Sequence, residues 1–292
     1  MPLEIHLKPV ETLLFRSDVV AVGKFRCPAT HPLFRDSGPC SHHTFVFPRT
    51  VTGIRHAGGP SFVGTPGAVA FYNQNQAYSR RAISEIDASD WYTVADEVLF
   101  DLVDAESDER PFRAATARVD ARTYLEQRML FDALDRGVEL DPLHVEETVL
   151  GILQRVAPKV ATTRAQSRDV DAVERVRELI ARDPSRNTPL GVLARAVALS
   201  PFQLCRAFKA HTGETMTRAR HSLRLRLALD RLRDRRLDLT TLALDLGYAS
   251  HSHFTAVFRR HFGITPSAFR MDNGGNAAFR VDRRRDGCGP RS

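Results

Sequence analysis

Apolar residues recur with helical spacing in the C-terminal third of the chain, and the pattern occurs twice. Leu190, Leu193, Ala194 and Val197 follow the i, i+3, i+4, i+7 spacing that places side chains on one helix face. The pattern of the helix that follows occurs at two places 50 positions apart. The first copy consists of Ser200, Leu204, Phe208, Lys209, His211 and Gly213. The second copy consists of Ser250, Phe254, Phe258, Arg259, His261 and Gly263. A motif repeated at a fixed distance indicates one structural unit used twice. Helix, tight turn and capped helix are the pattern of a helix-turn-helix.

Capping residues predict where the second helix of each copy begins and ends. Ser200-Pro201-Phe202-Gln203 has the sequence of a capping box, in which the Ser200 and Gln203 side chains satisfy free amides at the helix start. Ser250 is expected to cap the counterpart, and Gly213 and Gly263 to end the two helices. A helix over about residues 215–235 is predicted to join the copies at a fixed separation.

The first 112 residues have a different pattern. Short apolar stretches such as Thr44–Phe47 and Ala68–Tyr72 are separated by Gly- and Pro-containing turns, which is typical of a small sandwich or barrel. Two helices are expected next, one from Arg113 to Arg136 and one after Asp141-Pro142. The second carries an apolar stripe that is either core packing or a dimer seam, made of Val145, Val149, Ile152, Leu153 and Val156. Residues 158–170 are predicted to be a linker, and residues 272–292 a disordered basic tail.

Charge is distributed unevenly along the chain. Residues 170–292 hold 23 Lys and Arg against 12 Asp and Glu, a net charge of +11, whereas residues 1–169 have a net charge of −4. A polyanionic partner is therefore expected at the C-terminal half. The four cysteines are widely spaced, which fits a reducing compartment, and no run approaches the ~18 apolar residues of a membrane span. We expect a cytoplasmic protein.

The segment Leu242–Arg270, LALDLGYASHSHFTAVFRRHFGITPSAFR, resembles the C-terminal signature of the AraC/XylS family of bacterial transcription regulators. The resemblance extends over about residues 170–270 and includes both copies and the connecting helix. It implies an α+β multidomain protein: a cupin-like effector-sensing β-barrel (1–112), a helical dimerisation segment and linker (113–169), a double helix-turn-helix DNA-binding domain (170–271) and the tail (272–292). The resemblance of the N-terminal part to a cupin-like domain is weaker than the resemblance of residues 170–270 to the family's DNA-binding domain.

The resemblance also implies which residues contact DNA, because the second helix of each copy enters a major groove in this family. The base-reading residues would be Phe202, Cys205 and Arg206 in the first copy and His251, Ser252, Thr255 and Ala256 in the second. Arg206 suits direct readout, since arginine pairs with guanine through two hydrogen bonds. The phosphate contacts would be Ser200, Lys209, Ser250, Arg259 and Arg260.

Two groups of histidines and cysteines raise the question of a metal. His211 and His261 stand beside the closing glycines, where a helix C-terminus explains a histidine without a metal. Near the N-terminus the spacing matches no ligand pattern, over Cys27, His31, Cys40, His42 and His43. Adjacent strand residues such as His42 and His43 point to opposite faces, which argues against the alternative function, a metal-dependent cupin enzyme fused to a DNA-binding domain. We expect no enzymatic activity, no cofactor and no metal.

The N-terminal part is predicted to sense a small molecule whose identity the sequence does not give. Candidate polar residues are Arg49, Asn73, Gln74, Asn75, Gln76, Tyr78 and Trp91. On family grounds the protein is expected to be an activator, with promoter DNA, RNA polymerase, an effector and a second copy of the chain as partners. The two copies differ in turn and in base-reading residues, so one chain is expected to recognise an asymmetric DNA site.

Overall fold

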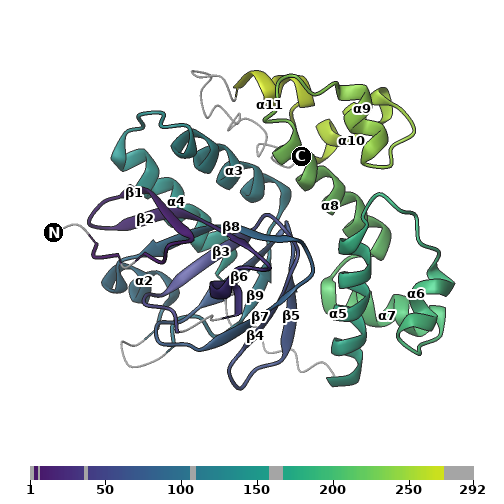
Figure 1. Cartoon of the computed structure of the whole chain (residues 1–292), viewed down its shortest axis with the longest axis horizontal. Helices are drawn as coiled ribbons and strands as arrows, with labels where there is room; N and C mark the ends of the chain where they lie inside the picture. The colour runs from purple at the N-terminus through teal and green to yellow at the C-terminus, as the bar shows by residue number, and fades with distance from the viewer. Residues whose placement is uncertain (1–2, 6, 36–38, 106–109, 158–166, 273–292) are drawn as a thin grey trace, which may run out of the picture.

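The computed structural model describes residues 3–5, 7–35, 39–105, 110–157 and 167–272. Two antiparallel sheets form the N-terminal part, a pair of helices covers one of them, and a series of helices forms the C-terminal part (Figure 1). The connecting helix α8 (Met216–Arg231) lies between the sheets and the outermost helices (Figure 1). The predicted α+β organisation is therefore confirmed at this level.

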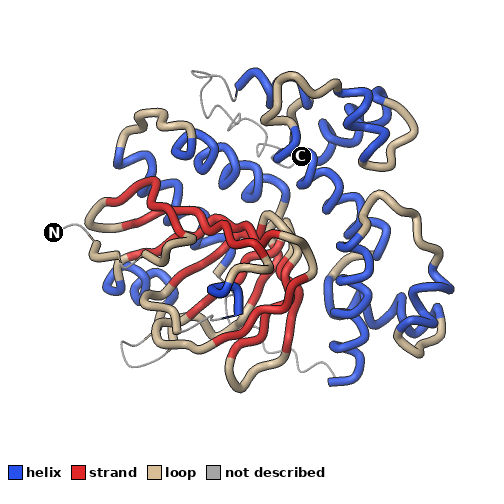
Figure 2. The backbone as a smooth tube through the Cα atoms, viewed as in Figure 1, coloured by secondary structure: helices blue, strands red, loops and turns tan. Residues whose placement is uncertain are grey.

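The strands are short and mostly follow the apolar stretches of the sequence (Figure 2). The longest pair is β2 with β8, whose register runs from Val20 opposite Val94 to Pro28 opposite Ile86. The strands are β1 (Glu11–Arg16), β2 (Val20–Pro28), β3 (Thr44–Pro48), β4 (Thr52–His56), β5 (Ser61–Gly64), β6 (Ala68–Tyr72), β7 (Tyr78–Ala82), β8 (Ile86–Val94) and β9 (Thr116–Arg118).

The expected closed barrel is not observed, because the strands form two separate sheets. One sheet has the order β1-β2-β8-β3-β6-β9 and the other β5-β4-β7. Strand β6 pairs with β3 on one side and with β9 on the other, so no strand of the smaller sheet can join it. Strand β9 also corrects the expected helix start at Arg113: residues 116–118 belong to the sheet, and the helix begins at Ala121 after the N-cap Asp120.

The helices of the N-terminal part are α1 (Pro32–Arg35), α2 (Asp96–Val103), α3 (Ala121–Asp135) and α4 (Pro142–Val156). Asp141 caps α4 and Pro142 is its first residue, as the sequence predicts. The apolar stripe of α4 is core packing, since its five residues Val145, Val149, Ile152, Leu153 and Val156 are at most 4% exposed in the single chain. Dimerisation through this segment stays a prediction.

Seven helices make up the described C-terminal part: α5 (Ser167–Arg182), α6 (Leu190–Ala196), α7 (Pro201–Thr212), α8, α9 (Leu239–Asp245), α10 (His251–Phe262) and α11 (Pro266–Asp272). The connecting helix ends at Arg231, earlier than expected. Helix α5 already begins at Ser167, inside the predicted linker, whose residues 158–166 lie outside the described residues. The predicted tail lies outside them as well, apart from Asp272 in α11.

The two helix-turn-helix units pack into different cores. The first unit has a small core of its own, which includes Val176, Leu193, Leu204 and Phe208. The second unit contributes to the apolar cluster that also contains residues of α3, α4 and the larger sheet. Its residues there include Leu242, Phe254, Phe258, Phe262 and Phe269. The second unit is therefore fixed to the N-terminal part by apolar packing, whereas the first is not part of that cluster.

The turn of the first unit contains a strained residue. Ala198 has φ +53°, in the left-handed region, at the position where the second unit has Gly247 with φ +78°. A left-handed conformation costs a residue with a Cβ atom about 1–2 kcal/mol.

Replacing Ala198 by glycine is therefore expected to stabilise the protein by about 0.5–1 kcal/mol, because the strain is relieved and part of the gain is offset by the extra freedom of glycine in the unfolded chain. Urea unfolding monitored by circular dichroism measures the change in the free energy of unfolding. Destabilisation of the Ala198→Gly variant would contradict the assignment of strain to this turn.

Candidate DNA-binding surface and internal cavity

Helix α7, the second helix of the first unit, is held by the capping box that the sequence predicts. The Ser200 hydroxyl accepts from the Gln203 amide at 3.2 Å, and the Gln203 side chain accepts from the Ser200 amide at 3.0 Å. The helix ends at Gly213, whose φ is +73°. Leu204 and Phe208 are buried, so the opposite face of α7 is turned to solvent.

This solvent face brings the expected contact residues of the first unit together. Phe202 is 69% exposed, Cys205 and Arg206 are exposed beside it, and Lys209 follows one turn later. The Arg206 guanidinium lies 5.7 Å from the centre of the Phe202 ring, within the range of a cation–π contact. Arg206 is therefore presented on the surface next to an aromatic ring that restricts where its side chain can go.

Helix α10, the second helix of the second unit, has the corresponding position but a different surface. Ser250 caps it by accepting from the His253 amide at 3.1 Å. Ser252 and Ala256 are exposed. His251 and Thr255 are half-buried, and the Thr255 hydroxyl lies 3.3 Å from Nε2 of His251. Of the four expected base-reading residues in this unit, two are free and two are hydrogen-bonded to each other.

The expected phosphate contacts divide into two kinds. Lys209, Arg259 and Arg260 are exposed cations in the last turns of the two helices. Ser200 and Ser250 are exposed N-cap residues whose hydroxyl groups already serve as caps. Backbone amides at such helix starts attract anions.

Arg224 on α8 ties the two units together, and the sequence gives no sign of it. The residue is 2% exposed. Its guanidinium donates to the carbonyls of Pro184 at 2.5 Å and Ser185 at 2.7 Å, after α5, and to that of Gly247 at 3.3 Å, in the turn of the second unit. Arg224 is therefore an internal link between the entry to the first unit and the turn of the second.

The two histidines beside the closing glycines lie in separate surroundings. Nε2 of His211 is 3.5 Å from a carboxylate oxygen of Glu174 on α5. Burial lowers the pKa of His261 to about 4, so this imidazole is neutral near pH 7. Each histidine thus has a structural setting within its own unit.

A cluster of buried charges joins α8 to the N-terminal part. Asp230 of α8 accepts from Arg49 at 2.8 Å and lies 3.0 Å from Arg128 of α3. Arg49 also pairs with Asp90 of β8 at 2.5 Å, and Arg128 with Asp132 at 3.0 Å. Arg49, one of the candidate sensing residues, belongs to this charge cluster. Burial raises the pKa of Asp90 to about 6, although the neighbouring arginines oppose the shift.

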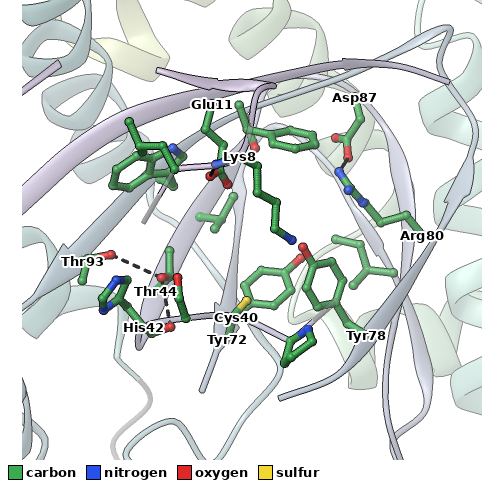
Figure 3. A pocket seen from close by; sticks show the side chains of 18 of the residues that line it. Lys8, Glu11, Cys40, His42, Thr44, Tyr72, Tyr78, Arg80, Asp87 and Thr93 are labelled. Atoms are coloured by element: carbon green, nitrogen blue, oxygen red, sulfur yellow. Dashed lines mark hydrogen bonds and ion pairs between the residues drawn. The ribbon is translucent and has the colours of Figure 1, made fainter. Parts of the chain in front are cut away.

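A cavity of about 110 Å³ lies between the two sheets (Figure 3). Tyr78 and Trp91, two of the candidate sensing residues, line it. Asn73 does not, because its side chain bonds the backbone of Phe112 in both directions, at 2.9 and 3.0 Å. The other charged and aromatic lining residues are Lys8, Glu11, Phe25, Tyr72, Arg80 and Asp87. No periodic signal in the sequence marks this set, which comes from five strands (β1, β2, β6, β7 and β8) and the segment before β1.

The cysteines and histidines of the N-terminal part are dispersed. His42 lines the cavity, whereas His43 packs on the other side against Phe100 and Phe112, with ring centres 5.6 and 6.3 Å away. The two adjacent histidines thus face different surroundings, although neither belongs to a strand as expected, because β3 begins at Thr44. Among the residues that the structure describes, no three His, Cys, Asp or Glu side chains are grouped to hold a metal ion.

The helices in the described ranges include none with the length and apolar character needed to cross a membrane.

Comparison with known proteins gives sequence matches to the C-terminal part and structural alignments over more of the chain. Residues 193–272 match a helix-turn-helix domain family. The regulatory protein SoxS of Salmonella typhimurium is 37% identical over 81 residues, which are 28% of this chain and 76% of SoxS. The transcriptional activator RhaS of Escherichia fergusonii is 39% identical over 79 residues, 27% of this chain and 28% of RhaS. Vibrio cholerae ToxT, in a crystal structure with a bound unsaturated fatty acid, aligns over 87% of this chain and 96% of its own at 14% identity and a TM-score of 0.35.

Proposed function

Because this chain belongs to the AraC/XylS family of DNA-binding transcription regulators, we propose that it activates transcription in response to a small molecule bound in its N-terminal part. Regulation of transcription through DNA binding follows from the family. The response to an effector, the activation of transcription and the roles of single residues are parts of the proposal.

The observation that carries the proposal is the pair of capped helices, α7 and α10, whose outer faces are open to solvent while their inner faces are fully packed. Arg224 and α8 hold the two units in one relative position. Two helices held in this way can enter successive major grooves on one side of DNA. Their outer surfaces differ, so the proposed binding site for one chain is an asymmetric sequence.

We assign base contacts to Phe202, Cys205, Arg206, His251, Ser252, Thr255 and Ala256, and phosphate contacts to Ser200, Lys209, Ser250, Arg259 and Arg260. Arg206 carries most of the discrimination, because it is exposed and charged and can donate two hydrogen bonds to guanine. Ser252 and Ala256 offer only small contacts, so the second unit is expected to discriminate less.

We assign effector binding to the cavity between the two sheets, since aromatic and charged groups line it. RNA polymerase and a second copy of the chain are proposed partners. Access to promoter DNA places the protein in the cytoplasm. The alternative, a metal-dependent enzyme, is not favoured, because SoxS is named a regulatory protein and RhaS a transcriptional activator.

The Arg206→Ala variant of the full chain is expected to bind its specific DNA site about 10- to 100-fold more weakly, corresponding to the roughly 1–3 kcal/mol of one bidentate arginine–guanine contact. Binding to unrelated DNA should change much less. Electrophoretic mobility shifts or fluorescence anisotropy with both duplexes measure the ratio, after genome-wide mapping of bound DNA has supplied the site.

Lys209→Ala, on the same helix, is the matched control. A lost phosphate contact should weaken binding to both duplexes alike and reduce the salt dependence of log K by about one unit. Equal losses on both duplexes for Arg206→Ala would remove Arg206 from the base-reading residues.

A further inference from the structure

The segment between α5 and α6, residues 183–189, is held against the turn of the second helix-turn-helix unit. Arg224 donates to the carbonyls of Pro184 and Ser185 in this segment and to that of Gly247 in the turn. The approach is so close that a Cβ atom on Gly247 would lie 2.5 Å from the Ser185 oxygen. Figure 1 shows this loop leaving the end of α5 beside α8 and passing to α6 below α9 and α10. We call residues 183–189 the bridging segment, because they belong to the first unit and contact the second.

The bridging segment contains a turn whose backbone is fixed from within. The Asp183 carboxylate accepts from the Ser185 hydroxyl at 2.6 Å and from the Arg186 backbone amide at 3.1 Å. Oδ1 of Asn187 accepts from Arg224 at 3.0 Å, which leaves the Asn187 amide nitrogen to donate elsewhere. Arg186 and Asn187 are both exposed. The segment therefore presents a guanidinium and an amide donor to solvent from an ordered backbone.

Positive charge collects at this junction. Arg220 of α8 donates to the carbonyl of Thr188 at 3.3 Å, and Arg224 donates to carbonyls as described. Among the described residues neither of these arginines pairs with a carboxylate, and Arg186 forms no ion pair either. The one carboxylate of the bridging segment is Asp183. Three arginines against one aspartate make the junction attractive to a polyanion.

The position of the bridging segment determines which part of the DNA it faces. Helices α7 and α10 are proposed to enter successive major grooves on one side of the duplex, and a minor groove lies between two such grooves. The segment joins the start of the first unit to the turn that precedes α10, so it lies between the two helices. In homeodomains, which also have three helices with the recognition helix last, the loop after the first helix contacts the DNA backbone. The bridging segment has this position in the first unit.

We propose that the bridging segment contacts the minor groove at the centre of the DNA site, with the Arg186 guanidinium in the groove and the Asn187 amide donating to base acceptors. This contact rests on the proposed DNA-binding role of the two units and adds a third, central contact to theirs.

The chemistry of the two donors gives the contact a base preference. In the minor groove A·T pairs show only the acceptors adenine N3 and thymine O2, whereas guanine adds an amino group that is itself a donor. A·T-rich tracts also narrow the groove and strengthen its negative potential, which attracts arginine. The centre of the site should therefore favour A·T pairs, although neither α7 nor α10 reads them.

Duplexes that differ only in the base pairs between the two recognised segments, at unchanged length, test the proposal. The full-length protein should bind an A·T-rich centre about tenfold more tightly than a G·C-rich centre, the effect of one good base contact. Inosine in place of guanine removes the amino group from the minor groove and keeps the major-groove acceptors, so it should restore most of the affinity. Fluorescence anisotropy measures the binding, on a site supplied by genome-wide mapping of bound DNA.

Arg186→Ala should weaken binding to the A·T-rich duplex about tenfold and reduce the preference for A·T to within about twofold. Alanine keeps the backbone amide that Asp183 binds, so the turn is retained. Arg182→Ala is the matched control four residues earlier. Arg182 pairs with Glu178 at 2.6 Å, and Glu178 also pairs with Arg81 of the N-terminal part, so the Arg182 side chain is already engaged. This variant should keep the full preference.

Equal affinity for the A·T-rich and G·C-rich centres would overturn the proposal, as would a G·C-rich duplex that inosine does not improve. An Arg186→Ala variant that behaves like Arg182→Ala would overturn it too. Equal losses on both centres for Arg186→Ala would place the side chain on phosphates and contradict its place in the groove. Specific binding that ignores the centre would leave the proposed function intact, whereas an unchanged chain without specific DNA binding would contradict the proposed function itself.

Discussion

Replacing Phe258 by alanine is expected to lower the free energy of unfolding by about 3–5 kcal/mol, the range for deleting a fully buried aromatic ring. Phe258 is 0% exposed on the inner face of α10. Its ring centre lies 4.8 Å from that of Phe262 and 5.6 Å from that of Phe254. The second unit shares its core with the N-terminal part, so the loss should destabilise both together.

Chemical unfolding monitored by circular dichroism measures the change, and Phe202→Ala provides the control. Phe202 is 69% exposed on the corresponding helix of the first unit, so the same substitution there should change stability by no more than about 0.5 kcal/mol. Phe202→Ala should instead weaken binding to the specific DNA site. Equal stability of the two variants would contradict the packing described for α10.

The second large effect is expected from Arg128→Met, which should destabilise the protein by about 3–5 kcal/mol, because removing one partner of a buried ion pair leaves its carboxylates with less compensating charge. Arg128 is 0% exposed and lies 3.0 Å from oxygens of both Asp132 and Asp230. Because Asp230 belongs to α8, the same change should loosen the contact between the DNA-binding part and the N-terminal part.

Arg155→Met is the matched comparison on the neighbouring helix α4. Arg155 pairs with Glu126 of α3, but the two side chains are 44% and 30% exposed. Exposed ion pairs contribute about 0–1 kcal/mol, so this variant should unfold at nearly the same urea concentration as the unchanged chain. If Arg128→Met were as mild as Arg155→Met, the buried cluster would not contribute to stability as described.

The parts of the fold that depend on local sequence could be predicted. Ser200, Gln203, Gly213 and Ser250 act on backbone groups within a few residues, and the structure has the caps and helix ends that these residues indicate. Gly247 also acts locally, because its left-handed backbone closes the second turn. The repeat shows at once that these local signals belong to one unit used twice.

The parts that depend on distant partners could not be predicted. The stripe on α4 shows which face is apolar but not what covers it, and the covering residues belong to the same chain. Strand β9 was missed because three residues, Thr116–Arg118, give no alternation long enough to detect, and pairing with β6 fixes them. The partners of Arg128 and Arg224 lie on other elements, so their burial has no local signature.

The cavity illustrates the same limit within the site. Tyr78 and Trp91 were among the candidates, but they stood beside polar residues that proved to serve turns and backbone contacts. Lys8 and Tyr72 were not candidates, because only the packing of the two sheets brings them near each other. The DNA-contact residues differ in this respect, since one helix presents them at regular spacing.

Arg224 has a consequence for the helical phase of the operator. Its bonds to Ser185 and Gly247 fix one unit against the other within the protein. DNA turns by roughly 34–36° with each base pair, so one pair inserted between the two recognised segments rotates the second away from its helix. The protein cannot follow this rotation without breaking buried bonds of a guanidinium group. The distance between the two segments should therefore be as strictly required as their base sequence.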